Sequence, residues 1–309
     1  MKKIPLGESE LNASQIALGC MRINRLPVNE AQALLKTALD NGIDFFDHAD
    51  VYGGGASETL FAEALKLNGD ARENIILQSK CGIRNIDGIP CFDFSKEHIL
   101  NSVDGILKRL RTDYLDVLLL HRPDALVEPE EVGEAFDILR SNDKVRYFGV
   151  SNQSPMLIKL LQRSVKQRLI INQVQFSIAH SPMIDQQINF NNVVPAGVDY
   201  TNEILEFCRL ENITIQPWSP FQYGFFEGVF VDSPKFPKLN EVLGRLATEK
   251  GVTKNAIVIA WLLRHPAKMQ PIVGTTNAGR LAECCKASDV TLSRKEWYEI
   301  YTSFGRRLP

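Results

Sequence analysis

Four residues whose side chains can move or stabilise a proton each follow a short apolar run. Asp47 comes after two phenylalanines, Lys80 ends the run 75–80, and His121 comes after three leucines. Tyr52 lies five residues beyond Asp47, directly before three consecutive glycines. The phenol of tyrosine has a pKa of about 10, so it acts as an acid near neutral pH only where a cation or burial adjusts that value. Lys80 is the cation that this chemistry needs, and the set predicts a proton-transfer site.

The apolar runs before these residues belong to a longer alternation of strand-like and helix-like segments. Eight strand-like segments can be counted, and most are continuously apolar: 15–18, 44–47, 75–80, 114–120, 145–150, 169–176, 213–218 and 270–273. Continuous apolar runs are typical of parallel strands that are buried on both faces. A polar residue such as Asp47 at the end of such a run indicates a cleft, where the carboxylate can be hydrogen-bonded.

Helix-like segments, with apolar residues three and four positions apart, separate these strands. We expect helices at 29–40, 57–67, 96–111 and 129–140, after Ser154-Pro155, at 203–210, 238–249, 255–264 and 278–287, and beyond Leu292. Ser57 can cap the second helix, and Asn68-Gly69 ends it. Eight strand–helix units predict a (β/α)₈ TIM barrel as a single domain over residues 1–309, with its chemistry at the carboxyl ends of the strands. No G-x-G-x-x-G follows the first strand, which disfavours an open doubly wound sheet.

The composition is that of an ordinary globular protein, with 309 residues, 44% hydrophobic and 23% charged residues, and a net charge of −2. This charge gives no general attraction for nucleic acid or anionic membranes and favours a small-molecule partner. No run reaches the roughly 18 apolar residues of a membrane helix, so we expect a cytoplasmic monomer or small homo-oligomer. The six cysteines and the histidines His98, His180 and His265 show no metal-ligand spacing, so we expect reduced thiols and no metal.

Asp47, Tyr52, Lys80 and His121, in this order at successive strand ends, resemble the catalytic tetrad of the aldo-keto reductases. Further motifs of that family follow in its order across nearly the whole chain: Gly149-Val150-Ser151-Asn152, Asn172-Gln173-Val174, Trp218-Ser219-Pro220, and Gly274-Thr275 with Arg280. Each motif alone is weak evidence, but the ordered set is specific. The family closes the bottom of its barrel with an N-terminal β-hairpin, and the polar turn 7–10 between two apolar pieces predicts one here.

The resemblance implies an oxidoreductase that reduces aldehyde or ketone carbonyls to alcohols by hydride transfer from NADPH. Tyr52 would donate the proton, and Lys80 would lower the pKa of Tyr52 toward the working pH by favouring the phenolate. Asp47 would pair with Lys80 and keep it charged. His121 would hydrogen-bond the substrate oxygen and fix its orientation.

The resemblance also implies cofactor contacts, which fall into three groups. Ser151, Asn152 and Gln173 would meet the nicotinamide carboxamide; Trp218, in one motif with Ser219 and Pro220, would stack on the ring; Gly274, Thr275, Arg280 and Glu283 would meet the adenosine end. Arg280 would be the cation for a ribose 2′-phosphate. Many NADPH-dependent members have a lysine where Gly274 stands, so one charge partner is absent. One arginine–phosphate contact predicts that NADPH binds about 10- to 100-fold more tightly than NADH.

Two long segments, 177–198 and 220–237, interrupt the alternation at the active-site end of the predicted barrel. Segments of this length are usually functional or disordered, so we expect both to shape the substrate pocket and to fold over the cofactor. Residues 20–22, at the end of the first strand, border the substrate or form a structural loop. His48, directly after Asp47, could point into the barrel.

Two other function classes stay open on the sequence alone. A Schiff-base aldolase also places a lysine on a barrel strand, so Lys80 could be a nucleophile; borohydride trapping of a substrate would identify that activity. A nucleotide sensor on the same fold would bind the cofactor with slow or no turnover, and turnover on a carbonyl panel would separate it from a reductase. Arg122 and Asp124, which follow His121, could form no more than a salt-bridged loop.

Overall fold

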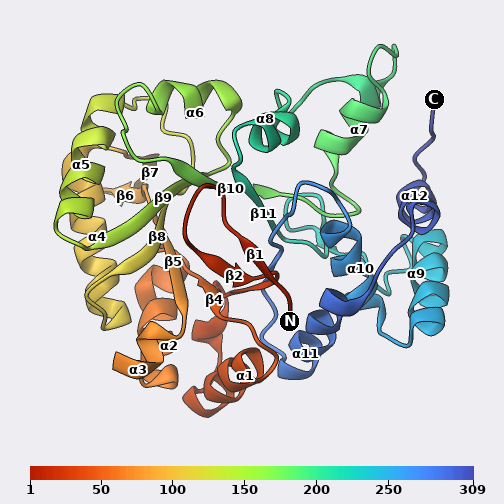
Figure 1. Ribbon diagram of the computed structural model, residues 1–309, viewed down its shortest axis with the longest axis horizontal. Coiled ribbons are helices and arrows are strands. Elements are labelled where there is room, and N and C mark those ends of the chain that lie inside the picture. The colour runs from red at the N-terminus through yellow and green to blue at the C-terminus, as the bar shows by residue number, and fades with distance from the viewer. Residues whose placement is uncertain (68) are drawn as a thin grey trace.

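Eight parallel strands form the centre of the protein (Figure 1). The computed structural model describes residues 1–67 and 69–309. Hydrogen bonds join the strands in the order β11-β10-β9-β8-β5-β4-β3-β14. The bounds are β3 Ala17–Gly19, β4 Phe45–Asp47, β5 Ile76–Cys81, β8 Leu115–Leu120, β9 Val145–Ser151, β10 Leu169–Gln175, β11 Thr214–Trp218 and β14 Ile272–Val273. The backbone N–H of Gln270, just before β14, donates to the carbonyl of Ile215 in β11 at 3.0 Å, which closes the circle. The predicted (β/α)₈ barrel is confirmed.

The strands alternate between an inner and an outer core. Phe45 packs in a cluster inside the barrel, whereas Phe46 packs in the cluster between the strands and the helices. This alternation follows from the period of two along a strand. All six residues of β8 are buried because the sheet is covered on both faces. Asp47, two positions beyond Phe45, is therefore on the inner face.

Helices surround the strands (Figure 1). Their bounds are α1 Val28–Asp40, α2 Ala56–Leu65, α3 Gly69–Glu73, α4 Lys96–Leu110, α5 Pro129–Ser141, α6 Pro155–Leu161, α7 Pro182–Ile188, α8 Ile204–Leu210, α9 Pro237–Lys250, α10 Lys254–Leu263, α11 Ala278–Cys285 and α12 Arg294–Ser303. Each predicted helix is present. Side-chain caps start several of them: Ser95 for α4, Ser154 for α6, Thr253 for α10, Asn277 for α11 and Ser293 for α12. Among the described residues no helix is both long and apolar enough to cross a membrane.

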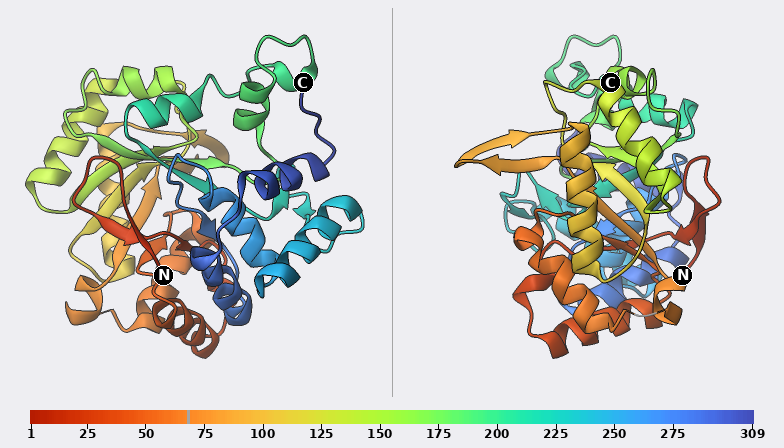
Figure 2. Two further views of the ribbon diagram at one scale, coloured as in Figure 1. Left: turned by 45° about the vertical axis from the view of Figure 1, so that its right-hand side comes forward. Right: turned by 90° about the vertical axis from the view of Figure 1, so that its left-hand side faces the viewer.

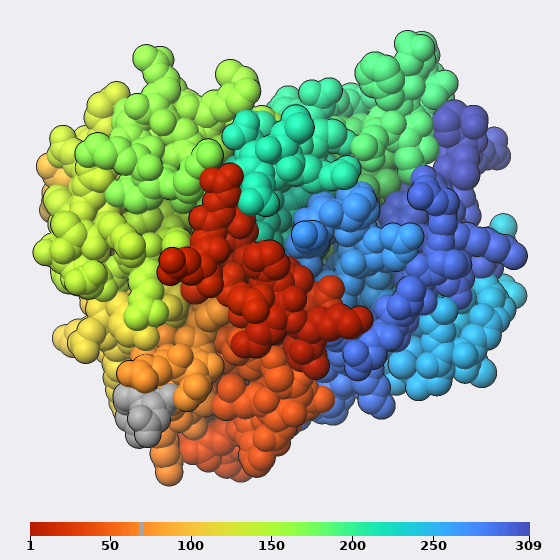
Figure 3. Space-filling view, in the orientation of Figure 1, coloured from red at the N-terminus to blue at the C-terminus, as the bar shows by residue number. Residues whose placement is uncertain are grey.

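The predicted N-terminal hairpin consists of β1 Lys3–Pro5 and β2 Asn12–Ser14, which pair antiparallel. Ile4, Leu6 and Ala13 pack against the inner-face residues of the strands. Figure 3 shows the N-terminal segment lying across the middle of one face of the molecule. The hairpin therefore closes the bottom of the barrel, and the opposite end holds the carboxyl ends of the strands.

Helix α2 begins differently from the prediction. Ser57 lies inside it rather than at its cap, and the Ser57 hydroxyl instead contacts the carbonyl oxygen of Met21 and the amide oxygen of Asn24. Left-handed glycines turn the chain into the helix, and the cap is Gly55, at φ 90°, two residues before Ser57. At the other end Lys66 adopts a left-handed cap, and Asn68 of the predicted helix end lies outside the described residues.

Two antiparallel hairpins near the carboxyl ends of the strands were not predicted. One consists of β6 Ile83–Ile86 and β7 Ile89–Phe92, and the other of β12 Gln222–Tyr223 and β13 Gly228–Val229. Figure 2 shows the β6–β7 hairpin projecting from the barrel on the side away from the N-terminal hairpin. Both hairpins contribute to the wall of the cavity described below.

Candidate active site

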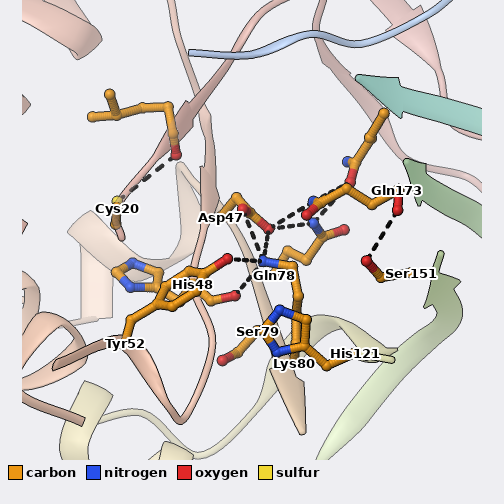
Figure 4. Close-up of polar contacts among 12 residues, drawn as sticks. Cys20, Asp47, His48, Tyr52, Gln78, Ser79, Lys80, His121, Ser151 and Gln173 are labelled. Carbon is orange, nitrogen blue, oxygen red and sulfur yellow. Dashed lines mark hydrogen bonds and ion pairs between the residues drawn. The ribbon is translucent and has the colours of Figure 1, made fainter. Parts of the chain in front are cut away.

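The four predicted catalytic side chains meet at the carboxyl ends of β4, β5 and β8 (Figure 4). Asp47 is the last residue of β4, Lys80 is next to last in β5, and His121 directly follows β8. Tyr52 begins the short 3₁₀ helix η2, Tyr52–Gly55, whose glycines Gly53 and Gly54 have positive φ. The glycines allow the tight turn that returns the tyrosine side chain over the strand ends.

Lys80 is the centre of the polar cluster. Its ammonium lies 2.8 Å and 2.9 Å from the two carboxylate oxygens of Asp47. It also donates to the carbonyl oxygen of His48 at 2.7 Å and to the Tyr52 hydroxyl at 3.1 Å. The side chain is fully buried. An ammonium has three donors, and these three partners satisfy all of them.

Burial and charge act in opposite directions on Lys80. Burial lowers the pKa of the ammonium. The attraction of Asp47, and then of Tyr52, raises this pKa by more than burial lowers it, so the pKa lies above the ordinary value. Lys80 is therefore a cation at neutral pH.

Tyr52 departs from the expectation that Lys80 would lower its pKa. Burial of the phenol raises that pKa, the Lys80 charge lowers it, and the nearby Asp47 raises it again. The net shift is upward, because Asp47 offsets much of the effect of Lys80 while burial disfavours the phenolate. The hydroxyl of Tyr52 thus carries its proton at neutral pH.

His121 lies beside Tyr52, with ring centroids 5.8 Å apart and the rings nearly perpendicular at 82°. Burial lowers its pKa well below the usual value, and the charges of Lys80 and Arg122 lower it further. The imidazole is therefore neutral, and a neutral imidazole has one N–H to donate. Its Nδ1 is buried and has no hydrogen-bond partner in the described part of the chain.

A cavity of about 960 Å³ opens over these side chains. Its volume is near the upper end of the range for small-molecule and cofactor sites, about 300–1,000 Å³. The sequence-predicted residues that line it are Asp47, Tyr52, His121, Ser151, Asn152, Gln173, Trp218, Ser219, Pro220, Gly274, Thr275 and Arg280. Lys80 lies beneath this surface, fully buried behind Tyr52 and Asp47.

A polar group next to Trp218 fixes one wall. The Trp218 indole N–H donates to the side-chain oxygen of Asn152 at 3.1 Å, and the Asn152 amide donates to the Ser151 hydroxyl at 2.8 Å. The Ser151 hydroxyl donates in turn to the backbone carbonyl of Gln173 at 3.0 Å. Asn152 has a left-handed backbone with φ 58°, a strained conformation that is common at functional sites.

The far end of the cavity is formed by the start of α11. Asn277 caps this helix by accepting a hydrogen bond from the Arg280 backbone, and the Arg280 side chain lines the cavity without an ion pair among the described residues. Glu283 does not line the cavity, but its carboxylate accepts a 3.0 Å hydrogen bond from Asn255, which does.

Comparison with known proteins agrees with this geometry. The sequence model of the Aldo/keto reductase family matches residues 15–303. The chain is an aldo-keto reductase. It is 35% identical to the uncharacterized oxidoreductase YcsN of Bacillus subtilis (strain 168), over 98% of both chains. It is 34% identical to the 6-dehydroglucose reductase of Agrobacterium fabrum, over 98% of this chain and 97% of the relative.

Among solved structures, the chain resembles the thermostable aldo-keto reductase Tm1743 crystallised with the inhibitor epalrestat. The TM-score is 0.78 and the sequence identity is 26%, over 98% of this chain and all of the other. Together with the family match, this places the chain among the oxidoreductases that act on carbonyl compounds.

Two residues of this aldo-keto reductase differ from the sequence expectations. The His48 ring does not point into the barrel; it lies 4.5 Å from the Phe61 ring of α2, because the residue after an inward Asp47 must face outward. Arg122 does not pair with Asp124, which instead accepts backbone hydrogen bonds from Phe94 and Leu126. The guanidinium of Arg122 lies 5.6 Å from the Trp218 ring centroid and lines the cavity.

A chain of hydrogen-bonded glutamines inside the barrel was not predicted from the sequence. Gln78 and Gln173 both donate to Oδ1 of Asp47, at 2.6 Å and 3.0 Å. Both also donate to the amide oxygen of Gln216, which donates to Gln270 at 2.8 Å. Gln270 donates to the carbonyl of Ser14 in the N-terminal hairpin at 2.7 Å. Polar amides inside apolar strands were the available signal, because buried amides require partners.

Much of the remaining cavity wall is apolar, and the two unpredicted hairpins supply part of it. Its apolar side chains include Ile83, Phe92, Phe221, Phe225, Phe226 and Val229. Phe226 stacks on Trp218 with centroids 6.0 Å apart. The segment 220–237 therefore shapes the pocket as expected, whereas the segment 177–198 supplies no lining residue. Asp185 of α7, within that segment, instead accepts a hydrogen bond from Tyr301 and forms an ion pair with Arg306 near the C-terminus.

Proposed function

We propose that this aldo-keto reductase is an NADPH-dependent enzyme that reduces aldehydes or ketones to alcohols, with Tyr52 as the proton donor. The contact between the Lys80 ammonium and the Tyr52 hydroxyl, at 3.1 Å beneath the cavity floor, carries the proposal. A protonated phenol at this place can supply a proton, and a fixed cation can stabilise the anion that remains.

The residues around the cavity fit the cofactor. Ser151 and Asn152 offer hydroxyl and amide groups near Trp218, and Arg280 offers a guanidinium that has no ion-pair partner in the described residues. When bound, the nicotinamide supplies the hydride. NADH is expected to bind more weakly, because it lacks the 2′-phosphate that Arg280 would contact.

Tyr52 and His121 would act on the substrate oxygen from two sides. As the carbonyl carbon gains the hydride, the carbonyl electron pair moves to oxygen, and this oxygen takes the proton from the Tyr52 hydroxyl. The tyrosinate that forms is stabilised by Lys80, whose charge Asp47 maintains. The neutral His121 can donate one hydrogen bond to the substrate oxygen and so orient it.

The charge state of Lys80 argues against the aldolase alternative. A Schiff-base lysine attacks as a neutral amine, which requires a lowered pKa. Burial lowers the pKa of Lys80, but Asp47 and Tyr52 raise it above its usual value. The sensor alternative differs from a reductase in turnover and not in binding, so the decisive measurement must record both.

The substitution Tyr52→Phe tests the proposal, since it removes only the hydroxyl. We expect carbonyl reduction to fall by at least about 10²-fold while the dissociation constant for NADPH stays within a small factor of wild type. NADPH consumption on a panel of aldehydes, ketones and quinones, together with cofactor titration, measures both quantities. Wild-type turnover in Tyr52→Phe would refute the role of Tyr52, and NADPH binding without turnover on the panel by the wild type would favour the sensor.

A further inference from the structure

Arg22 is a cavity-lining cation that lies next to Gly274, on the neighbouring strand. It follows β3 and precedes the 3₁₀ helix η1, Ile23–Arg25. Its guanidinium donates to the carbonyl oxygen of Gly274 at 3.3 Å. Because β3 and β14 are paired, with Leu18 opposite Val273, this contact between residues distant in sequence is built into the barrel.

The guanidinium of Arg22 lies beside the position that a side chain at residue 274 would occupy. A Cβ on Gly274 would meet the Arg22 Nη1 at 4.0 Å and no other nearby atom among the described residues. The position at which the sequence lacks a lysine is thus covered by a positive charge from the adjacent strand. A lysine at 274 would therefore place a second cation beside Arg22.

The charge of Arg22 has no counter-ion in the described part of the chain. Its contact with Gly274 uses one of five guanidinium donors, and no described carboxylate lies within ion-pair distance. Among the described residues, Asp47 is the one carboxylate that lines the cavity, and it is paired with Lys80. A partly buried arginine without a carboxylate partner, in a cavity wall, is suited to bind an anionic ligand.

We infer that Arg22 binds a phosphate of the cofactor, together with Arg280, and supplies the positive charge that is missing at position 274. The inference rests on the proposed use of NADPH. It assigns a cofactor role to a residue that the sequence placed only at the border of the substrate or in a structural loop. Two cations, Arg22 after β3 and Arg280 in α11, then line the cavity.

The test is the affinity of Arg22→Ala for NADPH and NADH, measured by quenching of tryptophan fluorescence; Trp218 is the tryptophan that lines the cavity. Loss of one charge-assisted phosphate contact should weaken NADPH binding by about 10- to 100-fold. A loss for NADPH alone would assign the contact to the 2′-phosphate, and an equal loss for both cofactors would assign it to the pyrophosphate. Arg25→Ala, an exposed arginine three residues away, is the matched control and should bind as wild type does.

A rescue variant distinguishes the loss of the Arg22 charge from a disruption of the fold by the substitution. Arg22→Ala/Gly274→Lys moves the cation to the neighbouring strand, where the space left by Arg22 can receive it. We expect this double variant to recover most of the NADPH affinity, and circular dichroism should show the same melting temperature in all variants that bind. Wild-type affinity of Arg22→Ala for both cofactors would overturn the inference alone, whereas a wild-type protein that binds neither cofactor would overturn the proposed function as well.

Discussion

The cations near the cavity lie in two different environments. Beneath the cavity floor Lys80 is fully buried, and each of its three donors has a partner within the protein. In the cavity wall Arg22 is half-buried and Arg280 is exposed, and neither has an ion pair among the described residues. The first arrangement holds its geometry before any ligand arrives, which is the preorganisation that proton transfer requires. The second leaves donors available for a ligand that brings its own negative charge.

Removal of the paired cation should have the largest effect. Lys80→Met takes away the charge that stabilises the Tyr52 anion, so we expect carbonyl reduction to fall by at least about 10²-fold. It also leaves Asp47 buried without its cation, which should destabilise the fold by about 3–5 kcal/mol. Steady-state kinetics and urea unfolding measure the two losses.

The double variant Asp47→Asn/Lys80→Met is the control for this prediction. It removes both charges, so it should regain part of the lost stability while reduction stays slow. Near wild-type turnover in Lys80→Met would contradict the role of the lysine, and unchanged stability would contradict the importance of the buried pair.

Removal of an unpaired cation should affect binding and leave the fold intact. Arg280→Ala should reduce the preference for NADPH over NADH by about 10- to 100-fold, because only the 2′-phosphate distinguishes the two. Its melting temperature should match that of wild type, since no described ion pair is lost. Dissociation constants for both cofactors provide the measurement. An undiminished preference would show that Arg280 does not contact the 2′-phosphate.

His48 provides a smaller, pH-dependent effect. Burial, with a contribution from the Lys80 charge, lowers its pKa to about 3, and neither ring nitrogen has a partner in the described residues. A histidine of the unfolded chain, with a pKa of about 6.5, binds a proton in the range where folded His48 does not, so stability falls as pH drops from about 6.5 toward 3. At pH 5 the cost is about 2 kcal/mol for this one group.

The matched variant for this effect is His48→Leu, compared with wild type by urea unfolding at pH 7 and pH 5. Between pH 7 and pH 5, the free energy of unfolding of the variant should fall by about 2 kcal/mol less than that of wild type. His98→Leu is the comparison: burial lowers the pKa of His98 as well, but its ring is only partly buried and contacts the Ser102 hydroxyl, so this variant should change the pH dependence less than His48→Leu does. Identical pH dependence in His48→Leu and wild type would mean that the His48 ring accepts a proton in the folded state.

The sequence was sufficient to predict the barrel and the meeting of the four central side chains. Both depend on local signals, because apolar runs define parallel strands and polar residues at their ends must share one edge. The orientation of His48 could also have been predicted, since alternation along β4 places it opposite to Asp47. The proximity of Arg22 and Gly274 could not, because it depends on how the first and last strands of the barrel align.

The direction of the pKa shift of Tyr52 was likewise beyond the sequence. The expected contact with Lys80 is present, but the result depends on how far water is excluded and on how closely Asp47 approaches the same cation. These quantities come from packing of the whole barrel. The presence of Lys80 as a charge partner therefore did not by itself determine whether the pKa of Tyr52 rises or falls.

The glutamine chain gives the barrel interior a single direction. Each amide has a donor end and an acceptor end, so the Ser14 carbonyl, which can only accept, fixes the orientation of Gln270. Gln270 then fixes Gln216, and Gln216 fixes the two amides that donate to Asp47. Reversal of any one amide would place two donors, or two acceptors, against each other along the chain. The N-terminal hairpin therefore determines which way the glutamine amides point, and so directs their N–H groups at the Asp47 carboxylate at the opposite end of the barrel.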